Sequence, residues 1–118
     1  MQLSKNFTAQ EMVCPCCGVA KMDMKFINTL QSLRDFFGKG LKINSGFRCV
    51  PHNDKIKGGK TSMHLKGQAV DIGTGTMTGV EKYQLIQHAM DIGFGGIGIA
   101  KSFVHIDNRS GPKVLWTY

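Results

Sequence analysis

The spacing of apolar residues changes along the chain, and this change most constrains its fold. Between residues 23 and 37 apolar side chains recur at steps of three and four, the period of a helix with one buried face, and Gly38 follows as a stop signal. Later apolar residues come in short runs, alternating with polar residues or bounded by glycine, as strands do. These runs are LKINSGFR, QAVDI, GFGGIGIA, SFVHID and KVLWTY. One helical period and several short strands predict an α+β fold.

Two further helix starts can be read from capping boxes. Thr8 with Glu11, and Thr78 with Glu81, have the spacing at which each pair satisfies the free backbone N–H groups of a first turn. The first box predicts a short helical turn and the second a longer helix. The apolar side expected for that longer helix consists of Val80, Tyr83, Ile86, Ala89 and Met90.

The chain reads as one domain over residues 1–118, with a mostly antiparallel sheet and helices packed on one side. A chain of 118 residues buries roughly two-thirds of its unfolded surface, and no repeat or linker divides it. Residues 50–63 are rich in Gly, Lys and Asn, which predicts an exposed loop of functional length.

The net charge of +7 favours a polyanionic partner. The basic residues are spread along the chain rather than gathered in an arm, so we expect no nucleic-acid partner. No apolar run approaches the roughly 20 residues that span a bilayer, so we expect no membrane insertion. The start, MQLSKNFTAQEM, lacks the layout of a secretory signal, from which we expect cytoplasmic synthesis. We also expect a monomer.

Histidine and aspartate occur at two places in a spacing that suits a metal site. His64 and Asp71 flank Gly67, which permits the chain turn needed to bring two residues seven apart together. His105 and Asp107 would share one face of a strand, while their apolar neighbours enter the core. Zinc in a hydrolytic site has three such protein ligands and an open position for water.

Three motifs in order resemble a known family. Ser62-x-His64-x-x-Gly67-x-Ala69-x-Asp71, preceded by Ser45-Gly46-Phe47-Arg48 and followed by Phe103-Val104-His105-Ile106-Asp107, resembles the zinc D-alanyl-D-alanine carboxypeptidase family of peptidoglycan peptidases. That family shares its fold with the hedgehog signalling domain and several phage endolysins. The resemblance runs from about Phe7 to Trp116. It implies hydrolysis of a peptidoglycan peptide, with one catalytic Zn²⁺ bound by His64, Asp71 and His105.

The same resemblance implies roles around the metal. Arg48 would steady the substrate carbonyl or carboxylate, and the residues expected to bind substrate are Arg48, Ser45, Ser62 and His52. Several branches of the family carry an acidic catalytic base three residues before the last zinc histidine, where this chain has Ser102. We therefore assign the base to Asp107. The alternative is that Asp107 orients His105 or an arginine.

The cysteines allow three interpretations. Cys14, Cys16 and Cys17 lie together, and Cys49 follows Arg48. A disulfide could tie the N-terminal turn to Cys49, or the thiols could stay reduced. A second, structural zinc is the third interpretation, because Cys14-x-x-Cys17 and Cys49-x-x-His52 form a possible Cys₃His set.

Two aromatic residues outside these motifs, Tyr83 and Trp116, are expected to be core or cleft-wall groups.

Two classes of function follow from these patterns. The favoured class is a zinc peptidase, either a carboxypeptidase or an endopeptidase, that acts on the bacterial cell wall. Its compact form suits a phage-encoded enzyme or one released on lysis. The alternative is a cell-wall-binding domain of the same fold that has kept zinc and lost catalysis, for which Ser102 is the supporting feature.

Overall fold

The computed structural model describes residues 1–59 and 61–118, and Lys60, within the predicted loop 50–63, lies outside the described residues. One five-stranded sheet runs through this part of the chain in the order β1-β2-β4-β3-β5. Its pairs are antiparallel except for β3 with β5, which are parallel. The strands are β1 (Lys42–Ser45), β2 (Ala69–Gly73), β3 (Gly96–Ile99), β4 (Phe103–Asp107) and β5 (Val114–Thr117).

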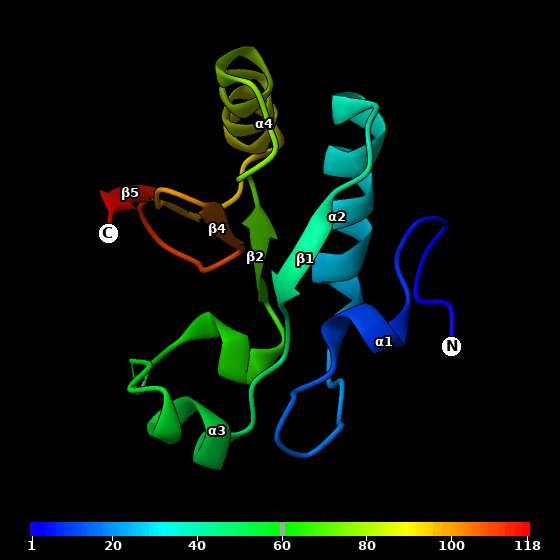
Figure 1. The fold of residues 1–118 in the computed structure, drawn as a ribbon, viewed down its shortest axis with the longest axis vertical. Coiled ribbons are helices and arrows are strands. Elements are labelled where there is room, and N and C mark those ends of the chain that lie inside the picture. The colour runs from blue at the N-terminus through cyan, green and yellow to red at the C-terminus, as the bar shows by residue number, and fades with distance from the viewer. Residues whose placement is uncertain (60) are drawn as a thin grey trace.

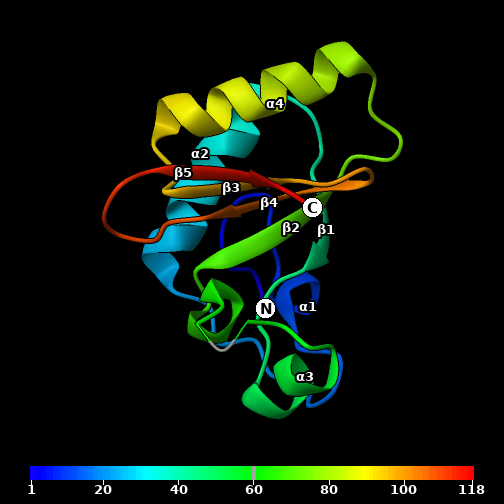
Figure 2. The same ribbon diagram turned by 90° about the vertical axis from the view of Figure 1, so that its left-hand side faces the viewer.

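Two long helices lie on one side of this sheet (Figures 1 and 2). They are α2 (Met24–Phe37) and α4 (Gly79–Ile92). The remaining helices are short, namely α1 (Ala9–Met12), α3 (Val50–Lys55) and the 3₁₀ helix η1 (Met63–Lys66). Figure 2 shows α3 and η1 on the opposite side of the sheet from α4. The predicted α+β class is confirmed.

Helix α2 forms where its apolar period predicted it. Asp23 accepts a hydrogen bond from the backbone N–H of Lys25 at 3.0 Å, which satisfies a free donor of the first turn. Gly38 ends the helix in a left-handed conformation, with φ of 77°. The buried stripe consists of Phe26, Ile27, Leu30 and Leu33.

Alternation along the strands separates the core from the opposite face. Val70 and Ile72 of β2, like Val104 and Ile106 of β4, join the core cluster that also contains the buried residues of α2. Their sequence neighbours must therefore point to the other face of the sheet. That face is not covered by α2 or α4, and it carries the polar residues described below.

Part of the predicted loop 50–63 is helical, so that prediction was wrong over α3. Cys49 precedes the helix and Pro51 lies in its first turn, where a missing N–H costs no hydrogen bond. This turn is too short to show an apolar period, which is why composition alone suggested a loop.

The predicted apolar face of α4 was also partly wrong. Val80 and Tyr83 are 69% and 71% exposed, whereas Ala89 is buried as predicted and Ile86 packs against the core. The helix also buries Leu85, which was not predicted. Two stripes with helical spacing coexist in this sequence, and packing against α2 selects the one through Leu85 and Ala89. Tyr83 is therefore neither a core nor a cleft-wall group. Across the described residues, no helix has the length and apolar character needed to cross a bilayer.

Candidate metal centre

One row of residues crosses all five strands of the sheet. The pairing places Ser45 of β1 opposite Asp71 of β2, and Asp71 opposite His105 of β4. His105 in turn lies opposite Gly98 of β3, which lies opposite Trp116 of β5. The sheet register therefore brings two candidate donors, Asp71 and His105, side by side although they are 34 residues apart in the chain.

His64 reaches the same place from outside the sheet. It lies in η1, and Ser62 accepts a hydrogen bond from the His64 backbone N–H at 3.3 Å at the start of this turn. Gly67 ends the turn with φ of 67°, and a Cβ there would collide with the backbone at Lys21. Glycine is thus required both for the conformation and for the close approach. The turn predicted between His64 and Asp71 is present at Gly67.

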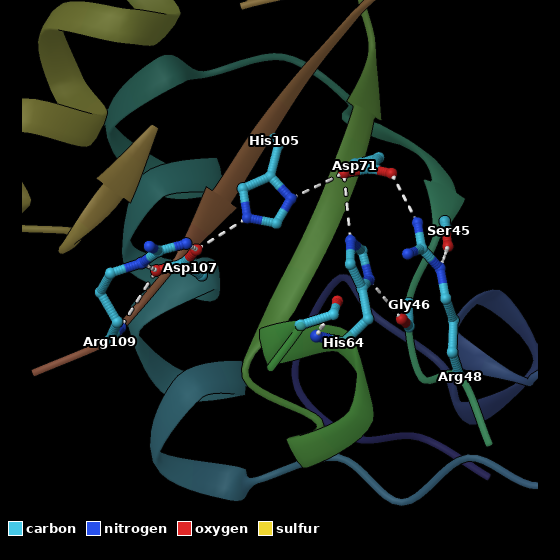
Figure 3. A network of polar contacts seen from close by, with 9 residues as sticks. Ser45, Gly46, Arg48, His64, Asp71, His105, Asp107 and Arg109 are labelled. Carbon is cyan, nitrogen blue, oxygen red and sulfur yellow. Dashed lines mark hydrogen bonds and ion pairs between the residues drawn. The ribbon is translucent and has the colours of Figure 1, made fainter. Parts of the chain in front are cut away.

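The donor atoms of His64, Asp71 and His105 all lie within 4.8 Å of one another, and all three residues are buried. One oxygen of Asp71 lies 3.2 Å from Nε2 of His64 and 3.0 Å from Nδ1 of His105 (Figure 3). Two imidazoles and a carboxylate that converge in this way form a donor set suited to zinc.

The second nitrogen of each imidazole is already held by an acceptor. His64 Nδ1 donates to the carbonyl oxygen of Gly46 at 2.7 Å, and His105 Nε2 donates to Asp107 at 2.7 Å. Such contacts fix the ring orientation and the tautomer of metal-binding histidines. They leave His64 Nε2 and His105 Nδ1, the two nitrogens that contact Asp71, as the ring atoms that would bind a cation together with that carboxylate.

Asp107 lies behind His105 and has no exposed surface. Besides the contact with His105, its two oxygens accept from the backbone N–H of Arg109 at 3.1 Å, from Nε at 2.9 Å and from Nη2 at 2.7 Å. The carboxylate therefore has four hydrogen-bond donors around it. Asp107 does not line the cavity that the three donor residues face.

Both carboxyl groups of the network are ionised at neutral pH. Burial alone raises the pKa of Asp71, but hydrogen bonds with His105 and His64 outweigh it and hold the pKa well below its ordinary value. Burial likewise raises the pKa of Asp107, and hydrogen bonds with His105 and Arg109 outweigh that effect. The centre thus contains two buried negative charges that the imidazoles and arginines, or a cation, must balance.

An open cavity of about 390 Å³ adjoins the donor set. Arg48 lines it and lies close to the donors, with Nη2 3.3 Å from Asp71 and Nε 3.3 Å from Ser45 Oγ. The backbone N–H of Arg48 also donates to the carbonyl oxygen of His64 at 3.1 Å. Arg48 is therefore held beside the donors while one side of the group stays open to solvent.

The remaining predicted residues lie at different distances from this cavity. Ser62 lines it, whereas Ser45 contacts Arg48 and does not line it. His52 lies outside the cavity lining, and its ring is close to Cys14 and Cys16 instead. Ser102 is exposed in the turn before β4.

An aromatic wall at the end of β5 was only partly expected. Trp116 lines the cavity, with its ring centroid 5.2 Å from that of His105, as the cleft-wall prediction had it. Tyr118 and Arg109 were missed, although both line the cavity and the Arg109 guanidinium lies 4.9 Å from the centre of the Trp116 ring. Alternating glycines in β3 signal that side chains lie close over that strand, but they do not say which residues these are.

Gly96 and Gly98 leave room for this wall. A Cβ at Gly98 would lie 2.5 Å from Nε1 of Trp116, and a Cβ at Gly96 would lie 2.6 Å from the carboxylate oxygens of Asp107. Side chains from β4 and β5 therefore extend over β3, where a larger residue would push them apart. Alternating glycines in a strand indicate such a close approach.

Three donors with room for a fourth ligand at an open cavity are what metal-dependent hydrolases have, and comparison with known proteins narrows this class. Residues 5–107 match the profile of the peptidase M15 family. Because the match covers most of the chain, this protein belongs to the peptidase M15 family. The predicted family and the predicted peptidase class are thereby confirmed.

One curated relative is the zinc D-Ala-D-Ala carboxypeptidase of Streptomyces albus G. It is 40% identical over 48 residues, which are 40% of this chain and 19% of the relative. The similarity thus spans less than a fifth of that protein's length.

Proposed function

We propose that this chain is a zinc peptidase that hydrolyses a peptide bond in bacterial peptidoglycan. The observation that carries the proposal is the convergence of His64, Asp71 and His105 at an open cavity, with the second nitrogen of each imidazole held by an acceptor. The name of the Streptomyces relative supports zinc as the metal and a D-Ala-D-Ala peptide as the substrate class.

The residues fit the metal by the chemistry of their donor atoms. A His₂Asp set leaves a fourth position for water or substrate, and the ring nitrogens nearest Asp71 are those without another acceptor. When bound, zinc would polarise the scissile carbonyl and lower the pKa of a water molecule in that position. His64, Asp71 and His105 are therefore proposed as its ligands.

Arg48 is proposed to bind the substrate. Its guanidinium lies at the cavity beside Asp71, where it can neutralise negative charge on a substrate carboxylate or on the oxygen that gains charge during hydrolysis. The aromatic wall of Trp116 and Tyr118 offers an apolar surface to the methyl groups of a D-Ala-D-Ala peptide.

For Asp107 we propose positioning of His105 rather than the general-base role. A base must come within about 3 Å of the proton that it removes, or act through one water. Asp107 is fully buried, contacts four donors and lies outside the cavity lining, which favours the alternative role. Among the described lining residues, Asp71 supplies the only side-chain carboxylate.

Because Asp71 is itself a proposed metal ligand, no other side-chain carboxylate among the described lining residues is left to act as the general base. This favours a second candidate, a non-catalytic zinc-containing domain that binds the cell wall. The net charge of +7 would concentrate either protein on an anionic wall, an effect that salt weakens. The synthesis in the cytoplasm and the phage origin that the sequence suggests stay predictions.

Incubation of the protein with purified peptidoglycan, with and without a chelator, separates the two candidates. We expect new peptide ends by mass spectrometry, lost with the chelator and restored by zinc. Terminal D-Ala release indicates a carboxypeptidase, and cleaved cross-links indicate an endopeptidase. His64→Ala should abolish release, while His88→Ala on α4 should not. Binding to the wall without metal-dependent release would overturn the peptidase proposal and favour the binding domain.

A further inference from the structure

Four cysteines and a histidine gather at one end of the molecule, outside the lining of the cavity at the candidate metal centre. Cys14, Cys16 and Cys17 lie in the segment after α1, Cys49 precedes α3, and His52 lies within α3. Figures 1 and 2 show the segment after α1 next to α3 at the end of the molecule opposite α4. All four cysteines are free thiols in the structure, and the peptidase centre uses none of these five residues.

The sulfur atoms are close together in a group, not in a single pair. Cys49 Sγ lies 3.5 Å from Cys14 Sγ and 3.4 Å from Cys16 Sγ. The donor atoms of Cys14, Cys17 and Cys49 are all within 4.8 Å of one another, and so are those of Cys14, Cys16 and His52. Ligands of tetrahedral zinc, with Zn–S of about 2.3 Å, are separated by about 3.8 Å. The group therefore has nearly the size of a zinc coordination shell.

The backbone around these residues favours the same arrangement. The turn from Cys14 to Gly18 is closed by a 2.8 Å hydrogen bond from the Gly18 N–H to the Cys14 carbonyl, and Gly18 has φ of 70°. It presents Cys14 and Cys17 at the two-residue spacing common in structural zinc sites. Cys49 is the N-cap residue of α3 and His52 lies three residues later in its first turn, so both belong to the N-terminal end of that helix.

We propose that Cys14, Cys17, Cys49 and His52 bind a second Zn²⁺, which has a structural role. A disulfide would use two of the four clustered sulfurs, whereas one cation can bind three of them together with the ring of His52. Four protein ligands close the coordination shell, so this ion has no open position for catalysis. Cys16 is the alternative to His52 as the fourth ligand.

The proposed ion would hold the segment that carries Arg48. Cys49 follows Arg48 directly, and its backbone N–H points to Cys14 Sγ at 3.5 Å. Nearby, the backbone N–H of Phe47 donates to the carbonyl oxygen of Met12 in α1 at 3.0 Å. Zinc at this place would bind ligands from the segment after α1 and ligands from the start of α3. It would therefore hold together the two chain segments that these contacts already join. Removing it should therefore loosen the position of Arg48.

Zinc counting on the whole chain tests the proposal directly. Protein purified under reducing conditions without a chelator should contain two zinc ions per chain by elemental analysis. His64→Ala should keep the cysteine-bound ion, and Cys49→Ser should keep the peptidase ion, so each variant should contain one. After replacement of zinc by Co²⁺, thiolate-to-cobalt absorption in the near ultraviolet should appear in the wild type and in His64→Ala and be absent from Cys49→Ser.

The matched variants Cys16→Ser and His52→Ala identify the fourth ligand. We expect Cys16→Ser to retain two ions and His52→Ala to lose or weaken the second, and the reverse result would overturn the assignment of His52. One zinc per wild-type chain, without thiolate–cobalt absorption, would overturn the site itself. So would a disulfide between these cysteines, seen as a loss of two hydrogens in the intact mass. The cobalt spectra of the wild type and His64→Ala decide the matter even where Cys49→Ser does not fold.

Discussion

Replacement of Asp107 by asparagine is the most informative perturbation of the metal centre. The carboxylate accepts from His105 and from three N–H groups of Arg109, and it has no exposed surface. Asparagine has nearly the same shape but only one acceptor oxygen, so its NH₂ group must face donors on one side. Either the His105 contact or part of the Arg109 contact is then lost.

The expected loss follows from this geometry. Removal of the group that orients a metal-binding histidine typically lowers metal affinity 10- to 100-fold. At about 1.4 kcal/mol per tenfold change, this corresponds to about 1.4–2.8 kcal/mol. The same misplaced amide leaves a buried donor without a partner, so we expect the free energy of unfolding to fall by about 1–3 kcal/mol.

Two measurements on Asp107→Asn separate positioning from base catalysis. Competition with a chromophoric chelator gives the affinity for zinc at the candidate metal centre, which is identified as the ion that His64→Ala lacks. Peptide release at saturating zinc gives kcat. We expect a weaker zinc affinity and a kcat that largely recovers when zinc is saturating. Asp91→Asn, an exposed carboxylate on α4, is the matched control and should change neither. An unchanged zinc affinity with a kcat that stays at least about 100-fold lower would refute the positioning role and restore Asp107 as the base.

Three further perturbations test other parts of the structure. Arg48→Gln should lower kcat/KM about 10²- to 10³-fold with unchanged zinc content, and unaltered kinetics would remove Arg48 from the site. Gly98→Ala places a Cβ 2.5 Å from the indole of Trp116, so we expect a loss of about 1–3 kcal/mol in denaturant unfolding and altered fluorescence of this single tryptophan. Hydrogen bonds from Lys39 and the Thr78 backbone lower the pKa of Glu81 to about 2. The folded pKa lies below the ordinary value of about 4.3, so the ionised Glu81 stabilises the folded state. This contribution is present above about pH 4.3 and is lost as the pH falls to about 2. The difference in unfolding free energy between wild type and Glu81→Gln should therefore shrink over that range, and a constant difference would contradict the assignment.

Local patterns in the sequence predicted the elements well where one pattern dominated. The period of α2 has a single apolar stripe between Asp23 and Gly38, and packing confirms it. In α4 two stripes compete, and only contact with α2 decides between them, so Val80 and Tyr83 were placed wrongly. Local spacing cannot reveal which stripe meets a partner that lies far away in the chain.

In the candidate site, too, local patterns predicted some features, while others depend on contacts that local patterns do not show. The same-face arrangement of His105 and Asp107 follows from strand alternation, and the chain turn between His64 and Asp71 follows from Gly67. Arg109 could not be predicted as the partner of Asp107, because the two-residue step beyond the strand end depends on the path of the following turn. The position of His52 next to Cys14 likewise depends on contacts between segments far apart in sequence.

The two glycines of β3 matter for anyone who wishes to move this centre into another protein. Grafting the three donor residues onto an unrelated antiparallel sheet would reproduce the ligands but fill positions 96 and 98 with ordinary strand residues. Those side chains would occupy the space that Asp107 and Trp116 now take above β3. A successful graft must therefore include the two glycine positions of the neighbouring strand together with the metal ligands.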